Sequence, residues 1–430
     1  MKVPTVGFAG MTHLGLVSGV CSAEKGFKTV LFDRDEARIG ALGRHELPVS
    51  EPRLQELIRR TAPCLEFSST AADLARCDLI YVAEDVPTEG AGWSDLKPID
   101  ALLEIVMHVA REDATVVVLS QVPPGFTRAK QRAGRNLFYQ VETLIFGRAV
   151  ERALIPERFI VGCAEPSQPL PAAYQDFLAA YGCPILRMRY ESAELAKISI
   201  NLCLVASLTT ANTLAELCEQ IGADWSEIVP ALKLDKRIGE HAYLTPGLGI
   251  GGGNLERDLA TVIRLCEQHG TDAAVVKACV ANSAHRRDWA VRLIREKILD
   301  ANPRATVAVW GLAYKENTHS VKNSPSLAAI AQLGDAVLRL HDPVVPASAA
   351  RHPRAQSSMD PLEAASGADA LMILTPWPEY RAIAASRVAA AMRGRTVLDP
   401  YAVLDAQAAA AAGLDLYSLG RGSTPRARSV

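Results

Sequence analysis

Short, almost continuously apolar runs alternate with stretches of helical periodicity at both ends of this chain. In the first part the apolar runs are Thr5–Ala9, Thr29–Phe32, Leu79–Val82 and Ala114–Leu119. Strands of a parallel sheet are buried on both faces, and a helical crossover carries the chain from one strand to the next. The alternation therefore predicts a doubly wound parallel sheet over roughly the first 185 residues.

The same alternation returns in the last part of the chain. Its strand-like runs are Ala305–Trp310, Leu338–His341, Ala370–Leu374 and Thr396–Leu398, and alanine-rich helical segments separate them. We therefore expect a second α/β domain that resembles the first one in layout.

An apolar stripe with steps of three and four residues dominates the middle of the chain. The stripe consists of Leu195, Ile198, Leu202, Val205, Leu208, Leu214, Leu217 and Ile221. A helix of roughly 30 residues would be about 45 Å long, too long for one small domain. This length suggests a connecting or dimer-forming helix. A second helical stretch is expected from Leu255 to Leu299, with an interruption at Gly270.

These patterns divide the chain into three parts. Residues 1–189 form the first α/β domain, residues 190–299 a central helical and dimerisation domain, and residues 300–430 the second α/β domain. The expected fold class is α/β, with two doubly wound domains joined by a long central helix.

Composition restricts the ligands and the compartment. The formal net charge is −2, with 49% hydrophobic and 22% charged residues, which is typical of a soluble globular protein. Neither nucleic acid nor a membrane is expected as a partner, because no excess of positive charge favours them. The N-terminus MKVPTVGFAG lacks the pattern of an export signal. The nine cysteines form no C-x-x-C pair, so we expect reduced core thiols in a cytoplasmic protein and no metal site.

The turn after the first strand carries a modified dinucleotide-binding pattern. Gly10, Thr12 and Gly15 occupy the three glycine positions of G-x-G-x-x-G. Glycine at these positions permits a tight turn, close approach of a pyrophosphate and close packing of helix on strand. Thr12 replaces the glycine of closest approach, so a displaced or weakened dinucleotide is expected. Asp33 ends the second strand, where a carboxylate accepts hydrogen bonds from an adenosine ribose.

These residues predict a Rossmann-like domain that binds NAD. Asp33 would repel the 2′-phosphate of NADP, but Arg34 beside it leaves this preference open. His13 is a candidate to assist in binding the phosphates. The expected cofactor-binding residues are Gly10, Thr12, His13, Leu14, Gly15, Asp33, Arg34, Val86, Ser120 and Gln121.

The segment from Gly247 to Asp258, GLGIGGGNLERD, resembles the loop G-x-x-x-G-G-S-C-x-x-K-D of the UDP-glucose/GDP-mannose dehydrogenase family. Other segments resemble further patterns of this family, in the same order, over nearly the whole chain. They include Glu51-Pro52, Ser120 with Pro123 and Gly125, Glu142 and Gly147 in VETLIFG, Glu194 with Lys197, Asn201 and Asn212, Arg237 in DKRI, Lys315 with Ser324 and Pro325, and Asp342-Pro343. The chain is therefore identified as a member of this family.

The resemblance implies an NAD-dependent oxidation of a CH–OH group in a nucleotide sugar. It implies that Lys197, Asn201 and Asp258 surround the oxidised hydroxyl, although Asp258 is also a plausible helix cap. Lys197 and Asn201 lie four residues apart and so share one helix face. The resemblance also implies a homodimer built on the central helix. The implied substrate-binding residues are Glu142, Leu144, Arg237, Tyr243, Gly251 and Lys315, with Arg237 reaching across the dimer.

Three substitutions affect the second half of the reaction that is usual in this family. Family members usually oxidise a hydroxymethyl group twice, through a cysteine adduct, to a carboxylate. Here Asn254 replaces the cysteine. Phe146 replaces a glutamate and Gln121 replaces a threonine, and in the family these two residues act on the water that hydrolyses the cysteine adduct. A carboxamide is not a nucleophile at neutral pH, and phenylalanine cannot act as a base. We therefore expect a two-electron oxidation to an aldehyde or ketone, or its reverse, at a site that contains Asn254.

Two alternatives remain open at this point. A four-electron dehydrogenase could form a uronic acid without the usual thiol, or the chain could be a non-catalytic homologue that binds a nucleotide sugar. The substrate is also open, because His319, Ser320 and Lys322 stand in place of the family's D-D-x-R, and Tyr401 stands in place of an arginine. A measurement of the affinity for NAD would distinguish an enzyme from a homologue that only binds a nucleotide sugar.

Overall fold

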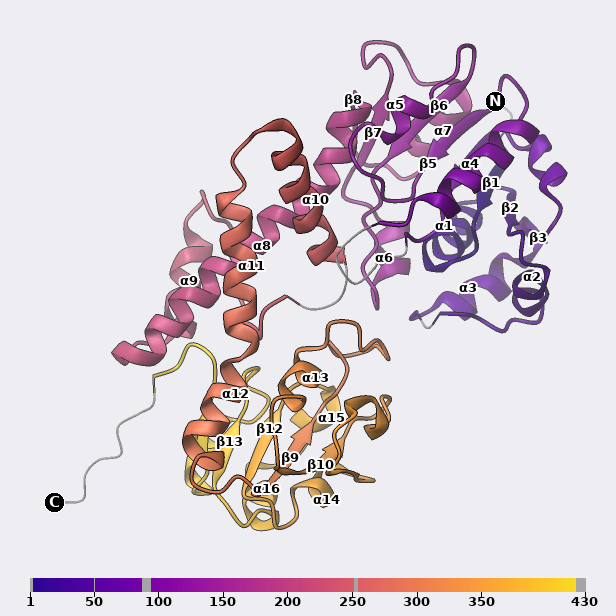
Figure 1. The fold of residues 1–430 in the computed structure, drawn as a ribbon. Helices are drawn as coiled ribbons and strands as arrows, with labels where there is room; N and C mark the ends of the chain where they lie inside the picture. The colour runs from indigo at the N-terminus through magenta and orange to yellow at the C-terminus, as the bar shows by residue number, and fades with distance from the viewer. Residues whose placement is uncertain (1–2, 50, 87–93, 251–253, 423–430) are drawn as a thin grey trace. The chain divides into compact units, whose positions relative to one another are not determined.

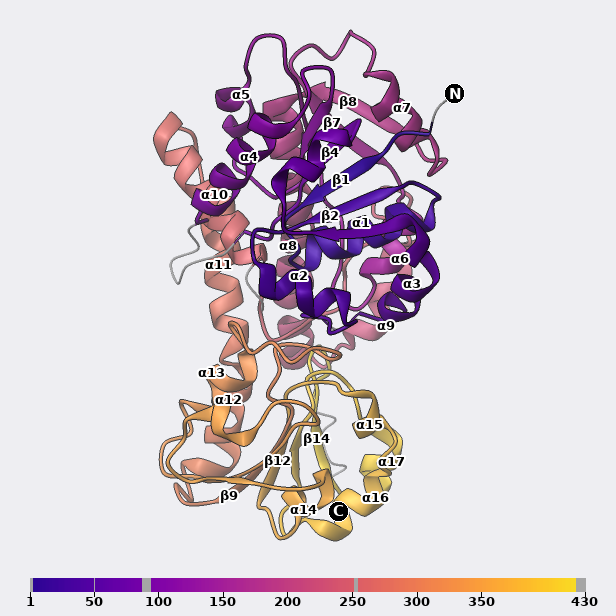
Figure 2. The same ribbon diagram turned by 90° about the vertical axis from the view of Figure 1, so that its right-hand side faces the viewer.

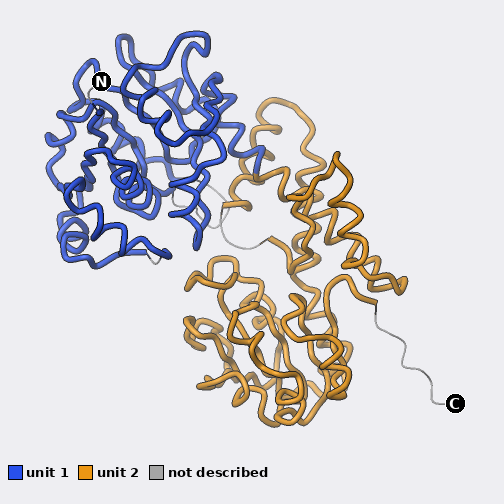
Figure 3. Tube along the Cα trace, turned by 180° about the vertical axis from the view of Figure 1, so that it is seen from behind, with its two compact units in different colours: residues 1–200 blue, residues 201–430 orange. Residues whose placement is uncertain are grey.

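The computed structural model describes residues 3–49, 51–86, 94–250 and 254–422. The chain divides into two compact units, residues 1–200 and residues 201–430 (Figure 3). Each unit contains one sheet with helices packed on it (Figure 1).

The sheet of the first unit has eight strands in the order β3-β2-β1-β4-β5-β6-β7-β8 among the described residues. All neighbouring strands are parallel except β6 and β7. The first six positions have the strand order of dinucleotide-binding folds. The chain adds β2 and β3 on one side of β1 and then β4, β5 and β6 on the other side, so the topological switch point of the sheet lies between β1 and β4. The strands are β1 (Val6–Ala9), β2 (Thr29–Phe32), β3 (Leu65–Ser68), β4 (Leu79–Val82), β5 (Thr115–Val118), β6 (Asn136–Gln140), β7 (Phe159–Cys163) and β8 (Ile185–Arg189).

Both faces of this sheet are buried, which explains the apolar runs in the sequence. Phe8, Leu31 and Tyr81 point into one core cluster. Phe32 and Ile80, which come next to them in the strands, belong to the opposite cluster. Consecutive side chains of a strand alternate between faces, so each face needs its own helical cover. The helices are α1 (His13–Glu24), α2 (Glu36–Gly43), α3 (Leu54–Thr61), α4 (Lys97–Val109), α5 (Phe126–Lys130), α6 (Ala149–Leu154) and α7 (Ala172–Ala179).

Among the described residues, the sheet of the second unit has six strands, all parallel to their neighbours. Figure 2 shows β9, β12 and β14 of this sheet. The strand order, β11-β10-β9-β12-β13-β14, is again that of a dinucleotide-binding fold. The predicted class, α/β with two doubly wound domains, is therefore confirmed. The strands are β9 (Thr306–Trp310), β10 (Val337–His341), β11 (Ala355–Ser357), β12 (Ala370–Ile373), β13 (Thr396–Leu398) and β14 (Asp415–Tyr417).

Helices form the rest of the second unit. Gly270, with a φ of +66°, follows the end of α10 and breaks the second helical stretch where the sequence predicted. The helices after the central one are α9 (Trp225–Leu234), α10 (Asn254–His269), α11 (Ala274–Arg287), α12 (Trp289–Ile294), α13 (Pro325–Ile330), α14 (Pro361–Ala365), α15 (Pro378–Arg381), α16 (Ala385–Ala391) and α17 (Ala406–Ala411), and a π-helical turn, η3 (Arg295–Leu299), follows α12.

The predicted long central helix is α8 (Tyr190–Ile221), which has 32 residues and runs from the first unit into the second. By length and composition alone it could cross a bilayer, and 33% of its most apolar window is buried. It also carries buried polar side chains that bind backbone amides: Glu194 accepts from Gly125, and Asn212 accepts from Gly247. Cys203, expected in the core, is exposed on this helix.

Candidate active site

The glycine-rich turn joins β1 to α1 at the carboxyl edge of the first sheet. Gly10 has a φ of +97°, and a Cβ atom placed there would lie 2.9 Å from the Cβ of Glu84. A Cβ atom on Gly15 would lie 1.8 Å from the carbonyl oxygen of Gly10. Only glycine is compatible with either position, so helix α1 packs against the strand as a dinucleotide-binding turn requires.

The carboxylate of Asp33 is held rigidly at the end of β2. Its Oδ2 accepts hydrogen bonds from the backbone N–H of Met11 and from Nη1 of Arg38, both at 2.8 Å. Its Oδ1 accepts from the backbone N–H of Asp35 at 2.9 Å. Asp33 is buried, whereas Arg34 is exposed. The sequence singled out Asp33 and Arg34 but gave no sign of Arg38.

Thr12 and Leu14 contact the segment that follows β4. The Thr12 hydroxyl accepts a hydrogen bond from the backbone N–H of Asp85 at 2.8 Å. The Leu14 backbone N–H donates to Oδ2 of Asp85 at 3.3 Å. Ser120, after β5, is buried and donates from Oγ to the carbonyl oxygen of Glu84 at 2.6 Å. The sequence analysis missed Asp85 and Glu84, although two acids directly after a buried strand are a readable signal.

Glu84 lies in an acidic part of this edge. Partial burial raises the pKa of its carboxyl above the ordinary value, and the neighbouring charge of Asp33 raises it further. Arg34 and Arg38 act in the opposite direction on the same group. The remaining predicted cofactor residues, Val86 and Gln121, are half-buried after β4 and β5 respectively. All of them lie at ends of strands that share the carboxyl edge, where parallel sheets bind nucleotides.

His13 is the first residue of α1 and is buried. Its Nε2 lies 2.9 Å from Oε1 of Glu51, and its ring stacks on Phe146 with ring centroids 4.1 Å apart. Glu51 also accepts from the backbone N–H groups of Gly147 and Ala149. Nε2 is thus engaged with a carboxylate, which leaves Nδ1 as the ring atom for the predicted phosphate contact. Glu51 therefore anchors the loop that carries Phe146, a role that its family dipeptide did not reveal.

Lys197 pairs with Glu142 inside the first unit. Its Nζ lies 3.5 Å from Oε2 of Glu142, and the two side chains are only 13% and 17% exposed. The other carboxylate oxygen of Glu142 accepts from the backbone N–H of Leu144. The lysine expected from the resemblance is therefore shielded from solvent and lies beside one of the expected substrate-binding residues.

Asn201 pairs with Asp258 inside the second unit. Its Nδ2 donates to Oδ2 of Asp258 at 2.6 Å. Asp258 is 3% exposed, and its Oδ1 lies 3.5 Å from Nε of the equally buried Arg257. The structure thus brings together two of the expected catalytic residues and adds Arg257, which the sequence analysis noted only as a replacement for the family's lysine. Asp258 lies in the second turn of α10, beyond the capping position.

Asn254 is the first residue of α10, and it is exposed. Two residues further on, Glu256 is bound by Nη2 of Arg287 at 3.2 Å and by Nδ2 of Asn323. Partial burial raises the pKa of the Glu256 carboxyl, and Arg287 partly offsets the effect. The start of α10 is therefore tied to two other segments of its unit, and Asn254 itself is open to a ligand.

Of the other expected substrate-binding residues, Arg237 and Tyr243 are exposed and Lys315 is half-buried. Arg237 follows α9, and its exposed guanidinium binds Asp235 with Nη2 2.6 Å from Oδ2. Tyr243 is 51% exposed. The ammonium of Lys315 lies over the ring of Tyr314, 5.6 Å from its centroid. Gly251 lies outside the described residues.

The switch point of the second sheet has a turn that resembles the first one. Gly311, after β9, has a φ of +95°, and a Cβ atom there would lie 2.4 Å from the Cβ of Thr375. Asp342, after β10, accepts from the backbone N–H of Leu312 at 2.7 Å and from the indole of Trp377 at 3.0 Å. Asp342 thus repeats the position of Asp33, and this turn leads to Lys315.

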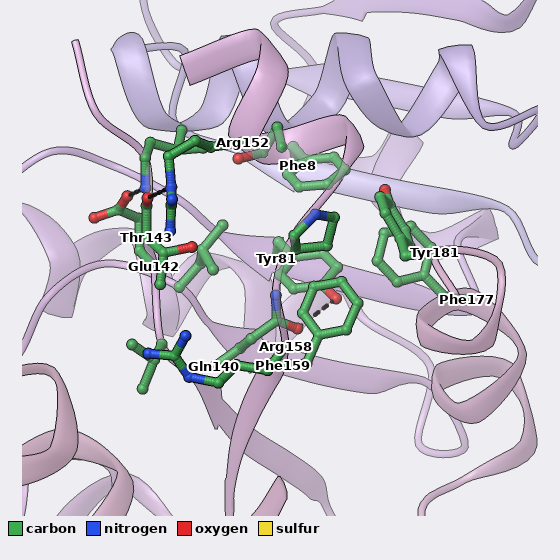
Figure 4. A pocket seen from close by; sticks show the side chains of 16 residues that line it. Phe8, Tyr81, Gln140, Glu142, Thr143, Arg152, Arg158, Phe159, Phe177 and Tyr181 are labelled. Carbon is green, nitrogen blue, oxygen red and sulfur yellow. Dashed lines mark hydrogen bonds between the residues drawn. The ribbon is translucent and has the colours of Figure 1, made fainter. Parts of the chain in front are cut away.

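A small cavity lies beside Glu142 in the first unit (Figure 4). One side is aromatic, with Phe8, Tyr81 and Phe177, and the opposite side carries Glu142 and Arg152. The volume of the cavity is about 60 Å³. Ligand pockets usually measure about 300–1,000 Å³, so this cavity is too small for a sugar.

The first switch point suits a dinucleotide. Gly10 and Gly15 stand where no side chain fits, and Asp33 presents a fixed carboxylate at the position that binds an adenosine ribose. Family models agree with this assignment over most of the chain. The NAD binding domain of the UDP-glucose/GDP-mannose dehydrogenase family matches residues 4–177, its central domain matches residues 191–284, and its UDP binding domain matches residues 308–406.

Similar proteins cover nearly the whole chain. It is 31% identical over 416 residues to the UDP-glucose 6-dehydrogenase of Pseudomonas aeruginosa, covering 91% of both chains. It is 29% identical to the UDP-glucose 6-dehydrogenase TuaD of Bacillus subtilis, covering 96% of this chain and 92% of that one. The structure of a UDP-glucose dehydrogenase from the archaeon Pyrobaculum islandicum matches with a TM-score of 0.84 at 27% identity, over 98% of both chains. The chain therefore belongs to the UDP-glucose/GDP-mannose dehydrogenase family and is an NAD-dependent nucleotide-sugar dehydrogenase.

Proposed function

We propose that this dehydrogenase removes two electrons from its nucleotide sugar and releases an aldehyde or ketone. The observation that carries the proposal is Asn254, which stands where the family resemblance places a nucleophilic cysteine. A carboxamide cannot add to the carbonyl carbon of an aldehyde at neutral pH, so no covalent adduct is available for a second oxidation at this position.

The groups needed for the first oxidation are present and ordered. In the reaction the hydroxyl of the sugar loses its proton to Nζ of Lys197, while the adjacent carbon becomes a carbonyl. NAD, when bound, accepts the hydride that leaves this carbon. Lys197 and Asn201 project from one face of α8, because they are one helical turn apart. The Asn201 amide donates a 2.6 Å hydrogen bond to Asp258, which fixes its orientation and leaves the amide oxygen for the substrate.

The groups needed for the second oxidation are missing. Hydrolysis of an acyl adduct requires a base that activates water, and Phe146 stands at the position of that glutamate. The Phe146 ring stacks on the buried His13 ring, and Nε2 of that imidazole is already engaged with Glu51. Three replacements fall on one half-reaction, while Lys197, Asn201 and Asp258 of the other half persist. A random loss of function would not separate the two halves.

The number of NADH molecules formed per sugar tests the proposal. UDP-glucose, the substrate named for the similar Pseudomonas aeruginosa and Bacillus subtilis enzymes, is the first of a panel of nucleotide sugars to offer. We expect one NADH per sugar consumed, and a product that mass spectrometry identifies as a carbonyl compound by its hydrazone. Two NADH per sugar with a carboxylate product would contradict the proposal, whether or not a thiol takes part.

Replacement of Asn254 by cysteine provides a matched gain of function. The new thiolate would add to the nascent aldehyde, and transfer of a second hydride to a second molecule of NAD would leave a thioester on the protein. Because Phe146 cannot activate water, we expect this acyl–enzyme to accumulate and to be visible in the intact protein mass. The wild-type protein, treated in the same way, should show no adduct.

We further propose that the enzyme is a homodimer built on α8. Leu214, Leu217 and Ile221 are exposed and lie on one face of this helix. An apolar stripe of this kind is a typical interface in oligomers. The exposed Arg237 is then available to reach the sugar held by the partner.

If the apolar stripe on α8 forms the dimer interface, lysines placed in it should dissociate the dimer and lower the mass of the particle in solution. Leu217→Lys combined with Ile221→Lys should give a monomer in light scattering, whereas the wild-type protein should be a dimer. Met359→Lys, which alters a residue that is 89% exposed outside α8, is the matched control and should remain dimeric. A dimeric double variant would place the interface elsewhere.

A further inference from the structure

The segment after β4 is fastened to the glycine-rich turn by a reciprocal pair of hydrogen bonds. The backbone N–H of Asp85 donates to the Thr12 hydroxyl at 2.8 Å, and the Asp85 carboxylate accepts from the backbone N–H of Leu14 at 3.3 Å. Thr12 is the N-cap residue of α1, yet its hydroxyl makes no capping bond to its own helix. Asp85 therefore supplies the cap that Thr12 would normally provide.

The position that this carboxylate takes is the one that a dinucleotide needs. The first amides of α1 have no partner within the helix, and the helix dipole makes its N-terminus favourable for anions. In dinucleotide-binding folds the pyrophosphate lies at this N-terminus, next to the glycine-rich turn. The Asp85 carboxylate is negatively charged, as a pyrophosphate is, and it binds at the same end of the helix.

We propose that Asp85 acts as a built-in competitor of the cofactor, by occupying the pyrophosphate position at the start of α1 until the dinucleotide displaces it. The Thr12 hydroxyl holds Asp85 in this position. The proposal concerns affinity for the cofactor and does not depend on whether the enzyme transfers one hydride or two.

The surroundings of Asp85 increase the repulsion. Asp33 and Glu84 lie at the same edge of the sheet, so three carboxylates are gathered where a pyrophosphate would bring further negative charge. Of the two nearby arginines, Arg38 is already bound to Asp33 at 2.8 Å, and Arg34 is exposed to solvent. A side chain at position 12 also occupies room that glycine would leave for the phosphates.

The test compares ligands with and without phosphates on purified, full-length protein. Isothermal titration with ADP, NAD and adenosine measures binding without any need for turnover. In Asp85→Asn the amide oxygen can still accept from Leu14, so the helix remains capped while the charge is lost. We expect the dissociation constants of ADP and NAD to fall by about tenfold, because a charge at contact distance is removed, and that of adenosine to stay constant.

A matched control removes one negative charge from the opposite edge of the sheet. Asp113 precedes β5, is exposed, and pairs with Arg111. Asp113→Asn should leave all three dissociation constants unchanged. An equal gain of affinity in this variant, or an equal gain for adenosine in Asp85→Asn, would overturn the proposal, because either result would reflect the overall charge of the protein.

A second variant tests the role of Thr12. Thr12→Gly removes the hydroxyl that holds Asp85 and restores the room that the turn normally offers. We expect tighter binding of ADP in this variant. Since both substitutions act on one contact, the double variant should gain less than the product of the two single factors. Unchanged ADP affinity in Asp85→Asn and Thr12→Gly would overturn the proposal.

Discussion

Replacing Lys197 with methionine should lower kcat for oxidation of the nucleotide sugar by about 10²–10⁴-fold, the range expected when a general base is lost. Methionine keeps the unbranched, apolar stem of lysine but has no amine to receive the hydroxyl proton. The side chain is only 13% exposed, so bulk water cannot easily replace it. The affinity for NAD should be unaffected, because Lys197 lies outside the glycine-rich turn.

Chemical rescue distinguishes a lost base from a disturbed fold. Small primary amines such as methylamine should restore part of the kcat of Lys197→Met, with a pH profile that follows the pKa of the added amine. Lys130→Met is the control, since Lys130 is paired with Asp100 on the same unit and has no expected role in the site. Its kcat should match that of the wild-type protein. Wild-type kcat in Lys197→Met would remove Lys197 from the mechanism.

The sequence predicted the strands β1, β2, β4 and β5 of the first sheet and β9, β10, β12 and β13 of the second, but it missed the edge strands and also the interior strands β6 and β7. β2, β4 and β13 have the predicted bounds because they are buried on both faces and therefore continuously apolar. The strands β8 and β11 are largely exposed at sheet edges, with the sequences ILRMR and AQS. Their polar side chains face solvent, so no apolar run marks them.

The sequence predicted the residues of the candidate site but not the contacts between them. The family patterns identified Lys197, Asn201 and Asp258, but a one-dimensional pattern cannot show that Asn201 binds Asp258 while Lys197 binds Glu142. The contact of Asp85 with Thr12 depends on the parallel pairing of β1 with β4, which brings residues far apart in the chain to one edge. Such contacts follow only once the strand order is known.

A second large effect is expected for stability, at Glu194 on α8. This side chain is fully buried, and its two oxygens accept from the backbone N–H groups of Gly125 and Thr127 at 2.6 and 2.8 Å. Glu194→Ala leaves both N–H groups without this partner. Each unsatisfied buried group costs about 1–3 kcal/mol, so the loss of both bonds should lower the free energy of unfolding by about 2–6 kcal/mol.

The matched variant, Glu194→Gln, should lose less, about 1–3 kcal/mol, because the amide oxygen can still accept one of the two bonds. Glu191→Gln is the surface control. Glu191 pairs with Arg128 in solvent, and its loss should cost at most about 1 kcal/mol. Urea unfolding followed by circular dichroism measures all three. A loss for Glu194→Ala no larger than that of Glu191→Gln would show that the two backbone bonds contribute little.

The two glutamates should also respond to pH in opposite directions. Burial raises the pKa of the Glu194 carboxyl in the folded state, against the smaller effect of the Thr127 and Gly125 amides. The folded state therefore binds this proton more tightly than the unfolded chain does, and the corresponding stability is lost as pH rises from the ordinary glutamate value through the raised one.

Arg128 lowers the pKa of Glu191 to about 2. The contribution of Glu191 to stability is therefore present above the ordinary glutamate value and is lost as pH falls toward 2. The difference in stability between wild type and Glu194→Gln should thus shrink as pH rises from about 4 toward neutral, whereas the difference between wild type and Glu191→Gln should grow chiefly as pH rises from about 2 to about 4.5. The same sign for both variants would mean that burial does not control the ionisation of Glu194.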